Sequence, residues 1–350
     1  MKKVISLILS VMMIVSLFAG CGSPAAPETT APAAETNAPE TAAPTAAQTE
    51  AVETVVYNVA IVQQLDHASL DEIRTAIVAQ LQALAEEKGV TVQIQEYNGQ
   101  NDTTILNQIG AQVVDDKVDM IIPIATLAAT CMVTASEGTG IPIVYAAISD
   151  PETVGLTGIS NVTGTSDALN TPFIIDMMLA VQPDIKTVGL LYSNSEANSA
   201  TPIAEAKAYL DEKGIAYLEK TGNTSGEVTE AASALVGRVD AVFTPTDNAV
   251  MAVEASVAEI LNAAGIPHYT GADSFVAAGA FATCGVNYTE LGSKTADMAM
   301  DILQGGEVPE FHVMDGGIIT VNTETAAALN LDYSAFGTMA NTVVEVTTGE

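Results

Sequence analysis

The sequence predicts an α/β protein in which two doubly wound parallel-sheet lobes are joined by a hinge. From residue 55 onward, apolar runs of strand length alternate with amphipathic stretches of helix length, and this order requires parallel sheets with right-handed crossovers. A similar phrase also occurs twice, as Lys117-Val-Asp-Met-Ile-Ile-Pro and as Arg238-Val-Asp-Ala-Val-Phe-Thr-Pro. A Gly-Ile-Pro sequence follows each phrase and opens the next strand. The repetition indicates two similar lobes rather than one large sheet.

The first strand and helix show the pattern that the rest of the chain repeats. Residues 55–62 are an apolar, β-branched run, typical of a strand buried on both faces. Ser69-Leu-Asp-Glu72 predicts a capping box, because the hydroxyl and the carboxylate can satisfy end amides reciprocally. Ile73, Ile77 and Leu81 then recur at helical spacing, and Gly89 predicts the end of the helix.

The same reading of period and breaker residues gives the remaining elements. We expect further strands at 90–97, 118–125, 141–149, 187–193, 215–221, 239–244, 266–269 and 318–321. We expect helices at 104–117, 127–137, 172–181, 199–213, 228–237, 249–264 and 289–303.

These elements predict how the chain is divided between the lobes. We expect lobe 1 to contain residues 55–163 and about 287–311, and lobe 2 to contain residues 164–286 and about 312–335. The chain would cross between the lobes three times. Crossings of this kind act as a hinge, and closure around a ligand is a known motion of such proteins.

The first 20 residues predict the signal peptide of a lipoprotein. Lys2 and Lys3 precede an apolar stretch at 4–18, and Ala19-Gly20-Cys21 supplies small residues for cleavage. This resembles the lipobox of bacterial lipoproteins, with Phe18 where the family prefers Leu. The resemblance implies that Cys21 carries the lipid, palmitate included, and becomes the mature N-terminus. A plain secretory signal cut near Ala19 is the alternative.

Residues 21–54 predict a solvated tether. They are rich in Ala, Pro, Thr and Glu with almost no large apolar side chain, so they cannot bury enough surface to offset their ordering entropy. We therefore expect a soluble module held at the outer face of the cell membrane by a lipid alone.

Charge and motifs exclude several classes of function. The formal net charge is −32, with 11 Lys and Arg against 43 Asp and Glu, whereas a nucleic-acid binder needs a basic patch. No dinucleotide, phosphate-loop or nucleophile-elbow motif occurs, so we expect no enzyme and no cofactor. No metal-ligand spacing occurs either. We interpret Cys131 and Cys284 as buried thiols, with a disulfide between them as the alternative.

Polar residues follow the predicted strands in both lobes. In open α/β sheets, ligands bind beyond the carboxyl ends of strands, so we expect these residues to line a cleft. Turn and N-cap chemistry would explain any one of them equally well. The candidate ligand-binding residues are Gln64, His67, Thr126, Ser149, Asp150, Asn194, Glu196, Asn198, Asp247, Asn248 and Asp273.

Five segments carry a resemblance to a known family. They begin at Val118, Ile141, Val188, Val239 and Gly279, and they read VDMIIPIAT, IPIVYAAISDP, VGLLYSNSEANS, VDAVFTPTDN and GAFATCGVNY. Together they resemble the ABC-transporter substrate-binding proteins of the tryptophan/tyrosine-type group, which have the type I periplasmic-binding fold. The resemblance extends from residue 55 to about residue 305. It implies a permease and an ATPase as partners.

The resemblance and the chemistry of the strand ends together predict an amino acid ligand, aromatic or branched. We expect Asp247 and Asp273 to hold its ammonium, and Thr126, Ser149 and helix N-terminal amides to hold its carboxylate. Candidates for the side-chain pocket are Tyr145, Tyr192 and Phe275. A sugar or nucleoside ligand, or a sensory or adhesive lipoprotein without a transporter, are the alternatives. We expect a monomer.

Overall fold

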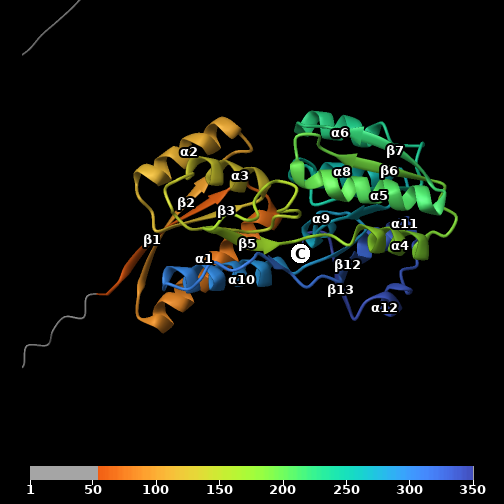
Figure 1. Ribbon diagram of the computed structural model, residues 1–350. Helices are drawn as coiled ribbons and strands as arrows, with labels where there is room; N and C mark the ends of the chain where they lie inside the picture. Colours follow the sequence, from red (N-terminus) through yellow and green to blue (C-terminus); the bar gives the residue numbers. More distant parts are fainter. Residues whose placement is uncertain (1–53, 350) are drawn as a thin grey trace, which may run out of the picture. The chain divides into compact units, whose positions relative to one another are not determined.

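Two β-sheets, each covered by helices on both faces, make up residues 54–349, the part of the chain that the computed structural model describes (Figure 1). These residues belong to one compact unit. The strands of the first sheet are β1 (Val56–Gln63), β2 (Thr91–Asn98), β3 (Met120–Ile124), β4 (Ile143–Tyr145), β5 (Val162–Ser166) and β11 (His312–Val313). Those of the second sheet are β6 (Thr187–Tyr192), β7 (Ala216–Thr221), β8 (Ala241–Thr244), β9 (His268–Thr270), β10 (Ala282–Gly285), β12 (Ile318–Asn322) and β13 (Thr342–Val346).

Both sheets have the same doubly wound core. The strand order is β11-β5-β4-β3-β1-β2 in the first sheet and β13-β12-β10-β9-β8-β6-β7 in the second. All the paired strands are parallel except β10 and β12. In each lobe the order reverses beside the first strand, which is where ligands bind in sheets of this topology. The predicted α/β class with two parallel-sheet lobes is confirmed.

The helices of the first sheet pack on it in two layers. They are α1 (Ala68–Lys88), α2 (Thr103–Asp115), α3 (Thr126–Ala135) and α10 (Tyr288–Leu303). Figure 1 shows α1 and α10 on one face and α2 and α3 on the other. The alternation of β1 explains this arrangement, because Val59 and Ile61 join the core under α1, whereas Ala60 and Val62 join the core under α2 and α3.

The second sheet is also covered by helices on both faces. They are α4 (Thr171–Val181), α5 (Ala200–Lys213), α6 (Ser225–Ser233), α7 (Asn248–Met251), α8 (Glu254–Ala263), α9 (Asp273–Ala277), α11 (Thr323–Leu329) and α12 (Phe336–Met339). A 3₁₀ turn, η1 (Ala197–Ser199), precedes α5. Val188 and Leu190 face the core under α4 and α5, and Leu191 and Val242 face the core under α6 and α8.

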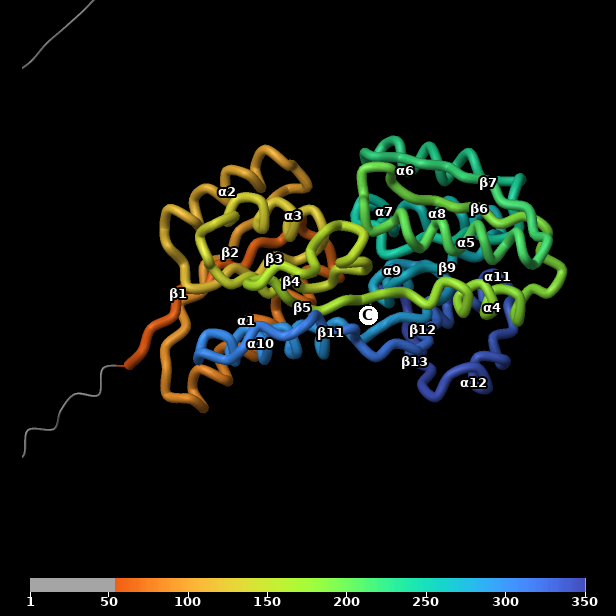
Figure 2. Tube along the Cα trace, in the orientation of Figure 1, coloured from red at the N-terminus to blue at the C-terminus, as the bar shows by residue number. Residues whose placement is uncertain are grey.

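The chain passes three times between the sheets (Figure 2). The passages follow β5, β10 and β11, at residues 167–170, 286–287 and 314–317. The predicted helix at 289–303 is α10, which packs against α1 and the first sheet, and the predicted strand at 318–321 is β12 of the second sheet. His312 and Val313 still pair with β5, so the last passage lies a few residues beyond residue 312.

Several local predictions were wrong, because tertiary partners replaced local ones. The capping box at Ser69 does not form: α1 begins after His67, the Ser69 hydroxyl bonds to Ser274, and Glu72 accepts a hydrogen bond from Thr289 at 2.7 Å. A capping box forms instead at Thr224, with Glu227, at the start of α6.

Other predicted elements are divided in the structure or were not predicted at all. The predicted helix at 249–264 is two helices, α7 and α8, separated by Ala252 and Val253. The strands β5, β10, β11 and β13 were not predicted. In β5 the sequence Val-Thr-Gly-Thr-Ser has one apolar residue, so its hydrophobic pattern is too weak to indicate a strand.

The two cysteines of the described chain are buried and unbonded. Cys131 belongs to the core under α3, and Cys284 belongs to the core under α4. Burial raises the pKa of both thiols, to about 11 for Cys284. The predictions for Cys21, the signal peptide and residues 21–53 of the tether lie outside the described residues. No helix within residues 54–349 has the length and apolar character needed to cross a bilayer.

The α1–α10 contact yields a stability prediction. A Cβ on Gly292 would lie 2.6 Å from the Ile73 carbonyl oxygen and 2.7 Å from the Ala76 Cβ, so the two helices would have to separate. Gly292→Ala should lower the free energy of unfolding by about 1–3 kcal/mol, the usual cost of overpacking. Gly226→Ala is the matched control, because a Cβ at Gly226 meets open space. Equal denaturant midpoints for the two variants would contradict this packing.

Candidate functional site

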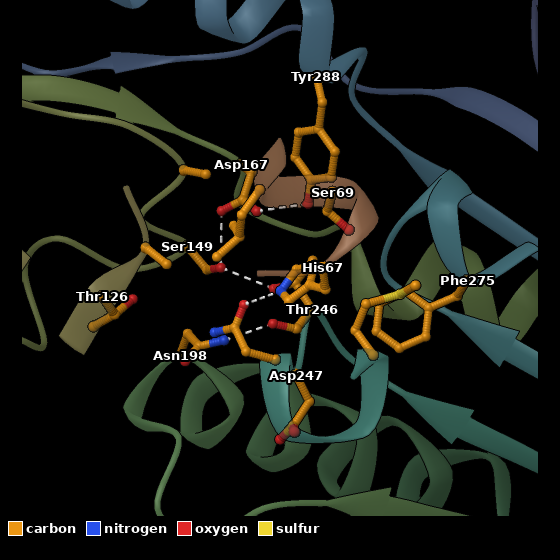
Figure 3. Close-up of a pocket in the computed structure, with 15 residues that line it drawn as sticks. His67, Ser69, Thr126, Ser149, Asp167, Asn198, Thr246, Asp247, Phe275 and Tyr288 are labelled. Carbon is orange, nitrogen blue, oxygen red and sulfur yellow. Dashed lines mark hydrogen bonds between the residues drawn. The ribbon is translucent and has the colours of Figure 1, made fainter. Parts of the chain in front are cut away.

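A narrow, nearly filled pocket with a cavity volume of about 20 Å³ lies where the carboxyl ends of the two sheets face each other (Figure 3). Both lobes contribute to its wall. The lining residues are His67, Ser69, Leu70, Ala125, Thr126, Ala147, Ser149, Asp167, Asn198, Thr246, Asp247, Asn248, Met251, Phe275 and Tyr288. Hydrogen bonds cross it from lobe to lobe, for example from His67 Nε2 to Asn248 Oδ1 at 3.0 Å and between the Ser149 and Thr246 hydroxyls at 3.1 Å.

Asp167 is the carboxylate at one end of the pocket. It directly follows β5 and is 3% exposed. Its Oδ1 accepts from the Ser149 hydroxyl at 2.9 Å, and its Oδ2 accepts from the Tyr288 hydroxyl at 3.0 Å. Burial raises the pKa of Asp167, and the two hydroxyls partly offset that rise. Among residues 54–349, none of the ion pairs includes Asp167, so a cation would be favoured beside it.

Two further acceptors on the wall have no partner. Asn248 donates its amide to Glu196 Oε2 at 2.8 Å, so Asn248 Oδ1 accepts from His67 Nε2 and the neutral imidazole leaves Nδ1 as an acceptor. Burial lowers the pKa of His67, although the Asn248 bond opposes that shift. Asn198 donates to the Thr246 carbonyl at 2.6 Å, which leaves its Oδ1 as an acceptor. His67 Nδ1 and Asn198 Oδ1 are buried and unpartnered.

The start of α3 provides hydrogen-bond donors on the pocket wall. Thr126 is the first residue of this helix, where amides lack intrahelical partners and attract negative charge. The residue before it, Ala125, has φ 72° and ψ 163°, and Ala147, two residues after β4, has φ 57°. Residues other than glycine rarely adopt a positive φ, and backbone strain of this kind is concentrated at ligand sites.

One side of the pocket is apolar. Leu70 of α1, Met251 of α7 and Phe275 of α9 contribute apolar side chains to its lining. In Figure 3, Phe275 lies on the side away from Thr126 and Ser149. The pocket thus combines a buried carboxylate, unpaired acceptors, a helix N-terminus and an apolar wall.

Six of the eleven predicted site residues line the pocket: His67, Thr126, Ser149, Asn198, Asp247 and Asn248. The other five do not line it. Asn194 is exposed and bonds to Thr221, and Asp150 bonds to Thr153 and Thr201. Gln64 and Glu196 bond to each other beside the pocket.

Neither of the two predicted ammonium partners turns its carboxylate into the pocket. Asp247 is fully buried and its side chain points away from the pocket in Figure 3. It caps α7 by accepting from Val250 N at 3.0 Å, and its other oxygen accepts from Ser193 N and the Ser199 hydroxyl, both at 2.7 Å. Asp273 lines a different cavity, beside Glu72. Burial raises its pKa to about 6, and the charge of Glu72 adds to the shift.

Sequence reasoning missed Asp167 because it missed β5. The rule that polar residues at strand ends form the site would have selected Asp167 once that strand was known. Tyr288 directly precedes the predicted helix at 289–303, but nothing in the sequence joined it to a carboxylate 121 positions away. Of the three aromatic candidates, Phe275 lines the pocket, whereas Tyr145 is packed in a core and Tyr192 bonds to Glu219.

Comparison with known proteins identifies the family. The model of a family described as ABC transporter substrate binding protein matches residues 58–336. The chain belongs to this family. Its members are extracytoplasmic solute-binding components of ABC transporters, and the resemblance seen in the sequence is confirmed.

Three relatives extend this result. The chain is 30% identical over 341 residues to a tyrosine-binding protein of Clostridioides difficile (strain R20291), covering 94% of this chain and 93% of that one. It is 27% identical, with a TM-score of 0.77, to an ABC domain in complex with L-Trp from Streptococcus pneumonia, covering 82% and 99% of the two chains. It is 32% identical, with a TM-score of 0.63, to the ligand-free, open structure of a substrate-binding protein with adhesive properties from Clostridium difficile, covering 83% and 99%.

Sequence identity and TM-score rank the two solved structures in opposite order. The open protein has the higher identity but the lower TM-score. As a whole, this structure superposes better on the L-Trp complex than on the ligand-free, open protein.

A stability measurement can test whether Asp247 has a structural role. Asp247→Ala removes a helix cap and leaves buried donors of Ser193 and Ser199 without an acceptor, so it should lower the free energy of unfolding by about 2–4 kcal/mol. Asp273→Ala should change it by less than about 1 kcal/mol, because burial and Glu72 disfavour that charge. Denaturant titration of both variants measures these changes in the free energy of unfolding. An Asp247→Ala protein of wild-type stability would contradict the structural role.

Proposed function

We propose that this protein binds an amino acid with an aromatic side chain in the pocket between its lobes and delivers it to the permease of an ABC importer. The observation that carries this proposal is the buried carboxylate of Asp167, which has two hydroxyl donors and, in the part of the chain that the structure describes, no ion-pair partner. An ammonium group would compensate its charge and restore its ionised form in the closed pocket.

The unpaired acceptors favour an ammonium over other cations of the same charge. An ammonium has three N–H donors, and the wall offers Asp167, His67 Nδ1 and Asn198 Oδ1 as acceptors. A ligand that carried only acceptors would leave these atoms unpaired, at a cost of about 1–3 kcal/mol each. The carboxylate of the same ligand would lie at the start of α3, near the Thr126 hydroxyl.

The apolar wall supports an aromatic side chain. Leu70, Met251 and Phe275 offer two flexible aliphatic surfaces and a phenyl ring, and aromatic rings pack well against both kinds. The relatives point the same way, since one is named a tyrosine-binding protein and another was solved with L-Trp. The shared family and the 30% identity support carrying this ligand class to the present chain.

Ligand binding tests this proposal. L-Tyrosine or L-tryptophan at 100 times its dissociation constant should stabilise the protein by about 2.7 kcal/mol, seen as a raised melting temperature. Asp167→Asn should weaken the affinity measured by calorimetry by tenfold or more, because a charged hydrogen-bond partner is lost. Asp184→Asn, at an exposed carboxylate outside the pocket, is the control. Stabilisation by a pentose or nucleoside, with none by either amino acid, would overturn the ligand class.

The N-terminal segment supports a membrane-attached protein. We propose that Cys21 is lipidated after removal of residues 1–20, and that residues 21–54 tether a monomer to the outer face of the cell membrane. The two lobes, hinged at their three connections, would then open and close beside the permease and its ATPase. A sensory or adhesive lipoprotein without a transporter is the alternative that a membrane tether alone would also fit.

Attachment is tested by fractionation. Wild-type protein should sediment with membranes and gain mass from a fatty-acyl group on Cys21. Cys21→Ser should be found in the soluble fraction or the medium, because one mutated residue removes the covalent anchor. Membrane retention of Cys21→Ser would count against the lipobox and in favour of another mode of attachment.

A further inference from the structure

Glu196 is a buried carboxylate that the proposed ligand site does not use. It lies between β6 and η1 in lobe 2, is 6% exposed, and does not line the pocket of Asp167. Its Oε1 accepts from Gln64 Nε2 of lobe 1 at 3.1 Å, and its Oε2 accepts from Asn248 Nδ2 of lobe 2 at 2.8 Å. Glu196 is therefore held by both lobes at once.

Gln64 fixes the lobe 1 side of this contact. Its Oε1 accepts from Leu127 N, in the first turn of α3, at 2.9 Å. This orients the amide so that Nε2 faces Glu196 and Asn101 Oδ1, the latter at 2.9 Å. The contact thus links the helix end proposed for the ligand carboxylate to lobe 2.

Asn248 fixes the lobe 2 side. Its Nδ2 donates to Glu196 and its Oδ1 accepts from His67 Nε2 of lobe 1. A continuous chain of hydrogen bonds therefore runs from α3 through Gln64, Glu196 and Asn248 to His67. It crosses the interface between the lobes twice, so opening the cleft would break it at two points.

We propose that Glu196 is a proton-controlled latch, which takes up a proton when the cleft closes and releases it when the cleft opens. This inference rests on the proposed binding function, since it regulates access to the same pocket. It differs from the earlier expectation that Glu196 contacts the ligand.

The charges around Glu196 give the direction of the effect. Its partners Gln64, Asn101 and Asn248 are neutral, and their hydrogen bonds lower its pKa. The charged group that acts on its pKa is Asp247 at the start of α7, and Lys207 and Glu219 line the same surface pocket as Glu196. Burial raises the pKa of Glu196 to about 7, and the charge of Asp247 adds to the shift. In an open cleft the carboxyl would meet water and ionise near its ordinary pKa.

The sign follows from linkage. A group whose pKa is higher in the closed form stabilises that form at low pH, and the stabilisation is lost as pH rises through the closed-form pKa. A shift from the ordinary value to about 7 implies that the closed-to-open ratio falls about tenfold between pH 6 and 8 through Glu196 alone.

Other titrating groups act on the same equilibrium. His67, which faces Asp66 and Asp71, has its pKa lowered mainly by burial, so it opposes closure as pH falls. Asp167 shifts in the same direction as Glu196. A comparison of wild type with Glu196→Gln cancels these contributions, because Gln keeps the shape and cannot ionise.

The experiment measures the lobe separation without any ligand. Spin labels on cysteines at exposed positions 112 of α2 and 212 of α5 would report closed and open populations by pulsed electron resonance, in the full chain with the three native cysteines replaced by alanine. The closed-to-open ratio of wild type, divided by that of Glu196→Gln, should fall about tenfold between pH 6 and 8.

Asp150→Asn is the matched control. Asp150 also bonds across the lobes, to the Thr201 hydroxyl at 2.7 Å. Burial tends to raise its pKa, but hydrogen bonds from Thr201 and Thr153 lower it below the ordinary value. Asp150→Asn should therefore keep the wild-type pH dependence.

A second variant, Gln64→Glu, tests the latch independently if the Glu196→Gln protein does not fold. Gln64→Glu places two carboxyl groups opposite each other, so it should reduce the closed population at pH 8 more than at pH 6. The latch is refuted if Glu196→Gln retains the wild-type pH dependence, or if Gln64→Glu leaves the populations unchanged at pH 8. Because no ligand is added, a failure to bind amino acids leaves these outcomes unaffected.

Discussion

A carboxylate enclosed by protein without a cation is the constraint on which the site depends. Asp167 is buried, and within residues 54–349 its carboxylate accepts hydrogen bonds from the Ser149 and Tyr288 hydroxyls. Hydroxyl donors stabilise its charge in part, but burial still raises its pKa. The energetic deficit is small when the cleft is open to water and large when it is closed. A ligand that brings a positive group therefore binds the closed form better, which is what couples recognition to closure.

The topology explains why this carboxylate and its partners meet. Each sheet reverses its strand order beside its first strand, and the residues after the strands of both sheets gather at that point. Asp167 follows β5, Ser149 follows β4, and Thr246 follows β8. Tyr288 is positioned separately, because α10 returns from the second sheet and packs on α1, where Gly292 permits close approach. The connections that form the hinge thus also place two of the site residues.

Closure involves two carboxylates with different surroundings. Asp167 faces the pocket, and its charge would be compensated by a ligand. Glu196 faces amide donors of both lobes, outside the pocket, and its charge would be compensated by a proton. Asp247 next to it serves neither purpose, since three donors hold it as a cap. Similar residue types at neighbouring strand ends therefore have separate roles, which depend on the groups that each one contacts.

The fold was predictable from the sequence because its signals are local and repeated. Apolar strands such as 55–62 and helix ends such as Gly89 can be recognised without tertiary information. β5 could not be recognised, since its polar sequence becomes a strand only by pairing between β4 and β11. Missing it concealed Asp167. The roles of Asp247 and Glu196 were not predictable for a different reason, because an acidic residue at a strand end reads the same whether it caps a helix, bridges two lobes or faces a ligand.

A crystal structure of the protein with L-tyrosine would test the central claim most directly. Our account predicts the ligand nitrogen within hydrogen-bond distance of an Asp167 carboxylate oxygen, about 2.7–2.9 Å, with both lobes in contact with the ligand. A ligand nitrogen bound to Asp273, or a ligand seated outside the pocket while Asp167 keeps only its two hydroxyl partners, would contradict it.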